Sequence, residues 1–198
     1  MPNTVEPRYT VSPGAGLIRP AVQCPSPNQD DRPDDAPLSL IVIHGISLPP
    51  GEYGGPHIEH FFTNCIDPAE HPYFEEICGL HVSAHLLIRR DGDLIQFVPF
   101  GRRAWHAGES TFRGRSRCND FSVGIELEGE DQTPYANEQY TVLARVLGAL
   151  FVAYPQLNPR LTAAHSDIAP GRKTDPGPAF DWMRLYDELS LTGANGAL

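Results

Sequence analysis

The chain is almost devoid of lysine. Of its fifteen lysine and arginine residues, only Lys173 is a lysine. Arginine offers a planar fork of donors, whereas lysine offers a compact charge on a flexible stem. A sequence that uses arginine at every other basic position therefore marks Lys173 as a place where a small cation is required. The alternative is a solvated surface lysine, which is the ordinary state of an isolated charge.

Long apolar runs and a surplus of positive charge are also missing. No segment approaches the roughly 18 apolar residues that a membrane-spanning helix requires. Residues 1–16 have neither the basic start nor the apolar stretch of a secretory signal. The formal net charge of −10 argues against nucleic-acid binding, which needs a basic face. We therefore expect no membrane partner and no nucleic-acid partner, and the sequence indicates no obligate protein partner.

The cysteines form neither a CxxC pair nor a disulfide framework. Without an export signal, free thiols in a reducing cytoplasm are the simplest interpretation. We therefore expect a cytoplasmic protein in which Cys24, Cys65, Cys78 and Cys118 are unpaired.

The length of 198 residues suits one domain with a sizeable core. Residues 1–37 are rich in proline and aspartate and show no periodicity, which predicts an irregular arm packed on the domain. Residues 38–190 are expected to form the domain itself, and residues 191–198 a C-terminal tail.

Apolar patterns predict the regular elements of this domain. Short β-branched runs at 39–44 and 121–128 are typical of strands. Asp91-Gly92 is a strong hairpin signal between the runs 83–90 and 94–98. Helices are expected at about 58–64, at 137–154 with Asn137 as its N-cap, and at about 180–189. The order of elements predicts an α/β (α+β-like) fold, a single domain with a central mixed β-sheet and packed helices.

Arginines crowd into one segment of this acidic chain. Such a run is usually a solvated loop, but it could also be the docking place of an anionic ligand. The residues are Arg102, Arg103, Arg113, Arg115 and Arg117.

Two of the eight histidines occupy positions typical of binding groups. His44 ends a buried strand where the chain turns into a loop rich in glycine, and His165 opens a second loop of this kind. Functional side chains gather at such strand ends because a rigid scaffold holds them there. His85 is expected to be a satisfied sheet residue. The other candidates, His57, His60, His71 and His81, are interpreted as structural or surface residues.

Two neutral imidazoles and one carboxylate make a suitable zinc site, in which a fourth tetrahedral position is left for water. His44, His165 and Asp175 could supply such a set. No short-spaced motif such as HExxH fixes this assignment, so a polar loop without metal is an open alternative.

Hydrolysis of an amide at such a site needs a base and a positive charge. Glu126 is the candidate base, because it projects from the strand face opposite Val123, Ile125 and Leu127. A solvated outward glutamate is the alternative interpretation, and Glu128 fits it equally. Lys173 could stabilise a tetrahedral oxyanion.

Seven strings of the chain resemble one enzyme family, the zinc-dependent N-acetylmuramoyl-L-alanine amidases of the type-2 amidase family. Within the family the resemblance is to cytoplasmic members that act on 1,6-anhydromuropeptides. The last string is the most specific, and together they span about residues 24–182. The strings are PSPNQDDRPDD, HGISLPPGEYGGP, DPAEHPYF, VSAHLLIRRDG, RAWHAG, CNDFSVGIELEG and HSDIAPGRKTDPGPAFDW.

The resemblance implies a type-2 amidase fold, also found in peptidoglycan-recognition proteins, with residues 38–190 as a zinc amidase domain. It implies one zinc ion per chain, held by His44, His165 and Asp175. It makes Glu126 the proton shuttle and Lys173 the stabiliser of the transition state. The implied substrate is a small muropeptide, whose lactyl group is amide-linked to L-Ala of an acidic stem peptide.

The resemblance also implies contacts to substrate. Arg117 and Arg172 match positions expected to face the stem carboxylates, and Trp105 and His106 either line the sugar side or serve in packing. Gly45 stands where relatives usually have asparagine, so one contact to substrate could be looser here. Ser166 and Gly171 are further departures, in place of cysteine and glutamate, and none of the three removes a ligand or catalytic group.

Two other functions remain open at this stage. Peptidoglycan-recognition proteins of this fold bind muropeptides without cleaving them, typically after loss of a zinc ligand. An autolysin amidase would act on intact cell wall instead. The implied ligands and catalytic groups favour an enzyme, and the missing export signal and wall-binding repeats disfavour an autolysin.

Overall fold

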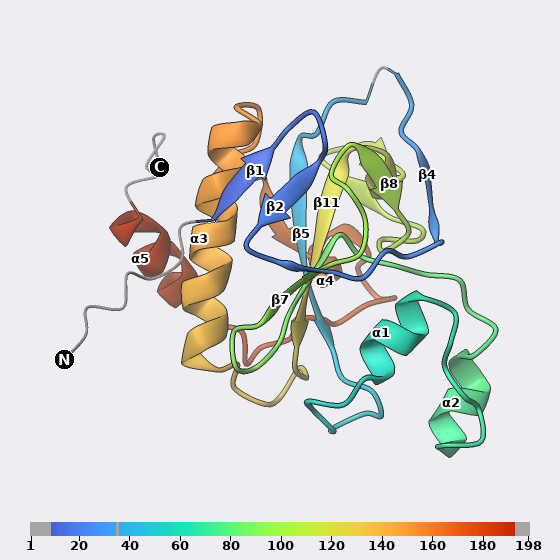
Figure 1. Cartoon of the computed structure of the whole chain (residues 1–198). Coiled ribbons are helices and arrows are strands. Elements are labelled where there is room, and N and C mark those ends of the chain that lie inside the picture. The colour runs from blue at the N-terminus through green and yellow to red at the C-terminus, as the bar shows by residue number, and fades with distance from the viewer. Residues whose placement is uncertain (1–8, 35, 193–198) are drawn as a thin grey trace.

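A computed structural model describes residues 9–34 and 36–192 of the chain. A six-stranded sheet forms its centre, with the helices packed around it (Figure 1). One strand pair is antiparallel and the other four are parallel, which confirms the predicted mixed α/β domain. In sheet order the strands are β12 (Thr162–Ala164), β5 (Leu40–Ile46), β11 (Ser122–Glu128), β6 (Leu86–Ile88), β7 (Leu94–Gln96) and β3 (Val22–Gln23).

The two central strands, β5 and β11, are the longest of the sheet. Every residue of β11 is buried, as are the first five of β5, because parallel strands are covered on both faces. Val123, Ile125 and Leu127 belong to the main hydrophobic core, as the alternation of β11 predicts. The other face of β11 is left for Gly124, Glu126 and Glu128.

The predicted hairpin is present as β6 and β7. Gly92 adopts a positive φ of 91° in the turn, a conformation that glycine takes without steric cost. His85 lies just before β6 and is fully buried, which agrees with its interpretation as a sheet-associated residue.

Helices α3 (Asn137–Ala153) and α5 (Trp182–Leu191) cover one face of the sheet, at the left of Figure 1. Leu143, Leu147 and Leu150 recur at helical spacing and are fully buried in the core cluster beneath. None of the described helices is long and apolar enough to cross a membrane.

The predicted asparagine cap of α3 is wrong. Ala136 occupies the cap position, and its backbone N–H donates to Gln139 Oε1 at 2.9 Å. Asn137 is the first helical residue instead, and the glutamine three positions after the cap provides the stabilising contact.

Three short helices lie outside this layer. The expected helix α1 (His57–Phe62) is present, whereas α2 (Pro72–Ile77) and α4 (His165–Ile168) were not predicted. Such short helices lack enough residues for a periodic apolar pattern. The start of α2 is locally encoded: proline stands in its first turn, and His71 Nδ1 accepts from Tyr73 N at 3.1 Å.

The N-terminal arm is not irregular, which corrects the prediction for its described part. Strand β3 extends the central sheet beside β7, β4 (Gln29–Asp31) pairs with β8 (Arg102–Ala104), and β1 (Thr10–Ser12) pairs with β2 (Leu17–Arg19). The strands are two or three residues long, too short for a visible alternation. At the other end, α5 extends to Leu191, the first residue of the predicted tail 191–198, and residues 193–198 lie outside the described residues.

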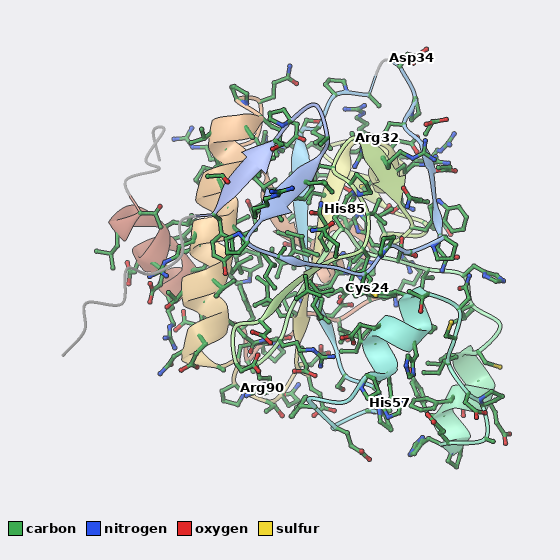
Figure 2. All side chains as sticks on the ribbon, viewed as in Figure 1. Cys24, Arg32, Asp34, His57, His85 and Arg90 are labelled. Carbon is green, nitrogen blue, oxygen red and sulfur yellow. The ribbon has the colours of Figure 1, made fainter. Side chains whose placement is uncertain are left out.

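Arg32 fastens this arm to the domain. Its guanidinium donates to the backbone carbonyls of Phe100, Asn119, Asp120 and Ser122 at 2.8–3.1 Å, and one Nη lies 2.9 Å from His85 Nε2 (Figure 2). Burial lowers the pKa of Arg32 to about 10, which still leaves it charged near neutral pH.

The arginine crowd forms internal contacts rather than a free basic loop. Arg103 makes ion pairs with Asp30 and Asp120 at 2.5 Å, and Arg102 pairs with Asp31. Arg115 stacks over the ring of Phe121 at 3.9 Å from its centroid. The other two members have the same kind of partner: Arg113 stacks on Phe112, and Arg117 pairs with Asp120. The four cysteines are free, as predicted.

We predict that Arg32→Lys lowers the free energy of unfolding by about 2–4 kcal/mol, because an ammonium cannot satisfy the same set of buried carbonyls. Chemical denaturation followed by circular dichroism measures this change. The matched control is Arg19→Lys at an exposed position, which should change stability by less than about 0.5 kcal/mol. Equal losses in the two variants would contradict the role given to Arg32.

Candidate metal centre

The parallel pairing of β5 and β11 sets His44 and Glu126 side by side. The two residues are register partners, and partners in neighbouring parallel strands project to the same face. His44 Nδ1 lies 3.9 Å from Glu126 Oε1. The sequence predicted both residues separately, and the register brings them together.

His165 reaches the same place from the neighbouring strand. Strand β12 pairs with β5 through Ala164 and Ile43, and His165 follows directly as the first residue of α4. Consequently, His165 and His44 stand opposite each other, one position beyond the last registered pair of the two strands.

The loop after α4 folds back to deliver Asp175. The carbonyl of Ala169 accepts from the backbone N–H groups of Arg172 and Lys173 at 3.1 and 3.0 Å. The backbone of Asp175 then returns to α4, where its carbonyl accepts from Ser166 N at 3.0 Å. This compact turn explains why a carboxylate ten residues from His165 faces the same point.

Three ligand-type atoms converge at this point. His44 Nδ1 and His165 Nδ1 are 2.9 Å apart, and Asp175 Oδ2 lies 3.2 Å from the first and 3.0 Å from the second. They form the one group of three potential metal ligands found among the described residues. Ligands about 2.0–2.1 Å from a tetrahedral zinc ion are roughly 3.3 Å apart, so the cluster is close to the size that zinc requires.

The donor set also fits a metal chemically. Two imidazoles and one carboxylate are the ligands of many catalytic zinc sites, which keep one position open. Burial lowers the pKa of His44 to about 4, so the ring is neutral and able to coordinate. Burial alone would raise the pKa of Asp175, but the close contacts of its carboxylate with the ring nitrogens of His165 and His44 outweigh burial and hold the pKa well below its usual range. The residues present therefore fit a divalent cation.

Glu126 is electrostatically unusual. Its Oε2 is buried and has no hydrogen-bond partner among the described residues. Desolvation and the charge of Asp175 raise the pKa of Glu126 well above its ordinary value. A carboxylate with a raised pKa and an unsatisfied oxygen beside a metal-type cluster can accept a proton and release it again.

The cluster lies in a cleft of about 680 Å³. Its lining includes apolar side chains such as Phe61 and Leu80 and acidic ones such as Glu130 and Asp131. Lys173 lines the cleft beside the cluster, and no arginine does so among the described residues.

The predicted substrate contacts are only partly gathered at the cleft. Trp105 lines it, and its Nε1 donates to Asp30 at 3.2 Å. Arg172 and Arg117 are not among the lining residues: Arg172 donates to the carbonyls of Ala107 and Glu109, and Arg117 pairs with Asp120 at 3.3 Å. Contact of these arginines with substrate stays a prediction.

Gly45 and His106 also line the cleft. Each is in addition in close contact with a side chain of the protein itself, Tyr135 for Gly45 and His44 for His106. A Cβ at Gly45 would come within 2.3 Å of Tyr135 Oη, so glycine makes room for this hydroxyl. The hydroxyl donates to the carbonyl of Pro176 at 2.9 Å, next to Asp175. The ring of His106 contacts His44, and desolvation lowers its pKa well below the ordinary value.

Sequence reasoning missed Tyr135 and Ser122, both of which support the cluster. A local signal existed for Ser122, a polar residue at the start of an otherwise apolar buried strand. Tyr135 sits in a polar loop far along the chain, and no local pattern links it to Pro176.

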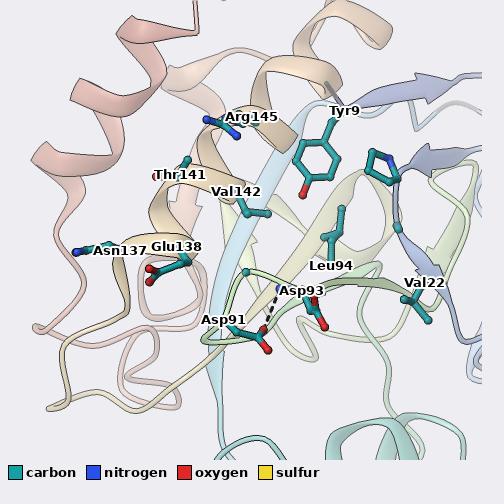
Figure 3. Close-up of a pocket in the computed structure, with 13 residues that line it drawn as sticks. Tyr9, Val22, Asp91, Asp93, Leu94, Asn137, Glu138, Thr141, Val142 and Arg145 are labelled. Atoms are coloured by element: carbon teal, nitrogen blue, oxygen red, sulfur yellow. Dashed lines mark hydrogen bonds between the residues drawn. The ribbon is translucent and has the colours of Figure 1, made fainter. Parts of the chain in front are cut away.

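A second hollow, of about 770 Å³, lies between α3 and the β6–β7 turn (Figure 3). It is lined by Asp91, Asp93 and Glu138, and Asp91 Oδ1 accepts from Asp93 N within the turn. Among the described residues, neither histidine nor cysteine lines it, so the described lining of this larger hollow lacks the reactive groups of the smaller one.

The fold and this buried cluster define a class of hydrolytic amidase. A family model described as N-acetylmuramoyl-L-alanine amidase matches residues 34–178, and the chain belongs to this family. It is 59% identical over 170 residues to the 1,6-anhydro-N-acetylmuramyl-L-alanine amidase AmpD of Escherichia coli, covering 86% of this chain and 92% of that protein. The resemblance found in the sequence is thereby confirmed.

Solved structures agree with this placement. A crystal structure of a selenomethionine derivative of AmpD superposes with a TM-score of 0.86 at 55% identity, covering 88% of this chain and 97% of that one. The E. coli amidase AmiD, in complex with anhydro-N-acetylmuramic acid-L-Ala-D-γ-Glu-L-Lys, matches with a TM-score of 0.56 at 26% identity. That match covers 91% of this chain and 65% of AmiD.

We predict that the metal-free protein takes up one zinc ion per chain and that Asp175→Ala strongly weakens this uptake, because one of three ligands is lost. Elemental analysis after dialysis against buffered zinc measures the bound metal. Asp187→Ala removes an exposed carboxylate of α5 and serves as the control, with unchanged zinc content. Full zinc occupancy in Asp175→Ala would exclude Asp175 as a ligand.

Proposed function

We propose that the chain hydrolyses the amide bond between the lactyl group of 1,6-anhydro-N-acetylmuramic acid and L-Ala of the stem peptide, in peptidoglycan recycling. The observation that carries the proposal is the convergence of His44, His165 and Asp175 in one cleft, beside the buried carboxylate of Glu126. The 59% identity to E. coli AmpD supports this bond as the target. AmiD, a more distant relative, was solved with an anhydromuropeptide, which supports a small muropeptide as the substrate.

His44, His165 and Asp175 would hold one zinc ion. When bound, zinc supplies Lewis-acid polarisation of a carbonyl and brings the pKa of a water molecule toward about 7. The ligand residues themselves set its position: two come from the ends of adjacent parallel strands, and the third from a turn that is hydrogen-bonded back to α4.

Glu126 would act as the proton shuttle. Glu126 lines the cleft, and its raised pKa suits proton transfer near neutral pH. It accepts the proton of the attacking water and then delivers it to the leaving nitrogen of L-Ala. Without this delivery, the amine would have to depart as an unstable anion.

Lys173 would stabilise the negative charge that develops on the lactyl carbonyl oxygen. It lines the cleft together with the cluster, and its backbone is fixed by a hydrogen bond to Ala169 O at 3.0 Å. A compact ammonium on a flexible stem can follow an oxygen that moves as the carbon becomes tetrahedral.

The set of residues in the cleft favours hydrolysis of a muropeptide over binding alone. All three candidate ligands and both candidate catalytic groups are present, whereas a binding module needs none of the catalytic groups. We propose a cytoplasmic location on the basis of the likeness to AmpD and of four free thiols.

The first test is incubation of the purified protein with an anhydromuramyl-tripeptide, followed by mass spectrometry. We expect release of the free tripeptide, loss of this activity with a chelator, and recovery when zinc is added back. Absence of cleavage by a protein that contains about one zinc per chain would refute the proposed reaction and favour muropeptide binding alone.

Glu126→Gln should retain zinc and the fold but lower kcat by about 10²–10⁴-fold, because glutamine cannot accept a proton. Glu138→Gln, at an exposed position in the first turn of α3, is the control and should turn over normally. Turnover of the Glu126 variant near that of the wild type would show that another group is the base.

Lys173→Met should lower kcat by about 10²–10³-fold, since methionine keeps the volume of the side chain but removes its charge. Zinc content should stay the same, as the ligands are untouched. Steady-state kinetics beside elemental analysis separates these two effects, and a variant with wild-type kcat would remove Lys173 from the catalytic group.

A further inference from the structure

The ring of His106 is held between His44 and a serine that starts β11. His106 Nδ1 lies 2.9 Å from His44 Nε2, and His106 Nε2 lies 3.0 Å from Ser122 Oγ. The two rings meet edge to face, with centroids 5.0 Å apart. Both nitrogens of His106 are thus engaged inside the protein, so the ring offers little to a ligand in the cleft.

His44, His106, Ser122 and the carbonyl of Cys118 form a row of hydrogen bonds. The donor in each of these bonds can be assigned by starting at the carbonyl, which can only accept. Ser122 Oγ donates to the carbonyl of Cys118 at 2.6 Å, and this donation uses its single proton. The hydroxyl must therefore accept from His106 Nε2–H. A neutral imidazole has one N–H, so His106 Nδ1 in turn accepts from His44 Nε2–H. The lone pair of His44 is then on Nδ1, the nitrogen that faces His165 and Asp175.

Packing and backbone hydrogen bonds both fix the position of the His106 side chain. A Cβ at Gly124 would lie 2.5 Å from His106 Cγ, so only glycine at this position of β11 leaves room for the ring. The backbone N–H groups of His106 and Ala107 both donate to Asn119 Oδ1, at 3.1 and 2.8 Å. The backbone of His106 is thus fixed, and a rotation of the ring would break its contacts with His44 and Ser122.

We infer that His106 is a positioning residue, which together with Ser122 and the carbonyl of Cys118 holds His44 in the tautomer that presents Nδ1 as a metal ligand. This inference rests on the proposed metal site at His44. Histidine ligands commonly donate their second N–H to a partner that fixes ring orientation and tautomer. Here the partner is a neutral imidazole and not a carboxylate, so it orients His44 without adding negative charge beside the metal.

The tautomers can be measured without any metal. In the full-length, metal-free protein with ¹⁵N-labelled histidine, we expect NMR to show His44 protonated at Nε2 and bare at Nδ1, and His106 in the same state. The reverse tautomer at His44 would overturn the inference. Because no zinc is present, this result is independent of the proposed reaction and of the proposed metal.

The second readout is zinc affinity, measured by competition with a chelator. His106→Met removes both ring nitrogens and should weaken zinc binding by about 10–100-fold. His106→Gln keeps one acceptor for His44 and one donor for Ser122, and should restore affinity to within a few-fold of the wild type. The control His81→Met changes an exposed loop histidine and should bind zinc as the wild type does.

These measurements distinguish a positioning role of the His106 hydrogen bonds, here called the His106 relay, from a role of the ring in packing alone. Wild-type affinity in His106→Met would overturn the positioning role. Equal weakness in the methionine and glutamine variants would also overturn it, because the loss would then follow the missing ring and not the missing hydrogen bonds. A wild-type protein that binds no zinc would instead refute the metal site, while the tautomer measurement would still decide the relay.

Discussion

The in-register parallel pairing of β5 and β11 is the constraint on which the cleft depends. It aligns His44 with Glu126, and the pairing of β12 with β5 adds His165 one step beyond. Side chains alternate between the faces of a sheet, so a slip by one residue would turn His44 into the core behind α3. The apolar residues on that opposite face, Ile43 and Ile125 among them, therefore fix the position of the polar ones.

Hydrogen bonds connect this strand pair to distant parts of the chain. Arg32 of the arm fastens the carbonyls of Asn119 and Ser122, and Asn119 in turn holds the backbone of His106. His106 contacts His44 directly. Three contacts therefore connect the arm to the metal-type cluster: Arg32 with Asn119, Asn119 with His106, and His106 with His44. Through them, the ordered arm and its buried guanidinium help to hold the residues around the cluster in place.

The sequence predicted those parts of the fold that have a periodic pattern or a strong local signal. The strands with Ile43 and Ile125, the Gly92 hairpin and the helix through Leu147 are all of this kind. Short elements such as α2 and the paired strands of the arm escaped because two to six residues cannot show a period. From the residues alone the cluster was one open possibility, and only the resemblance made it a definite prediction, because its members lie far apart in sequence.

The residues that hold the cluster in place could not be predicted from the sequence, since their role depends on which side chains meet in space. The sequence around His106 does not show whether its ring hydrogen-bonds to another histidine or lines a sugar site. Likewise, Gly45 and Gly124 are informative only once their neighbours are known, Tyr135 for the first and His106 for the second. Glycines required by a close approach of other side chains cannot be told from turn glycines in a single sequence.

The two neighbours Arg172 and Lys173 explain why a chain so rich in arginine keeps one lysine. The fork of Arg172 is occupied by two carbonyl oxygens, those of Ala107 and Glu109. Arg32 and Arg103 are used in the same way, each fixed by several oxygens at once. A guanidinium at position 173 would share the cleft with several carboxylates, Glu126 and Asp175 among them, and would pair with them. A lysine ammonium keeps its charge mobile, and at this position a mobile charge can meet an oxygen that becomes negative only during the reaction.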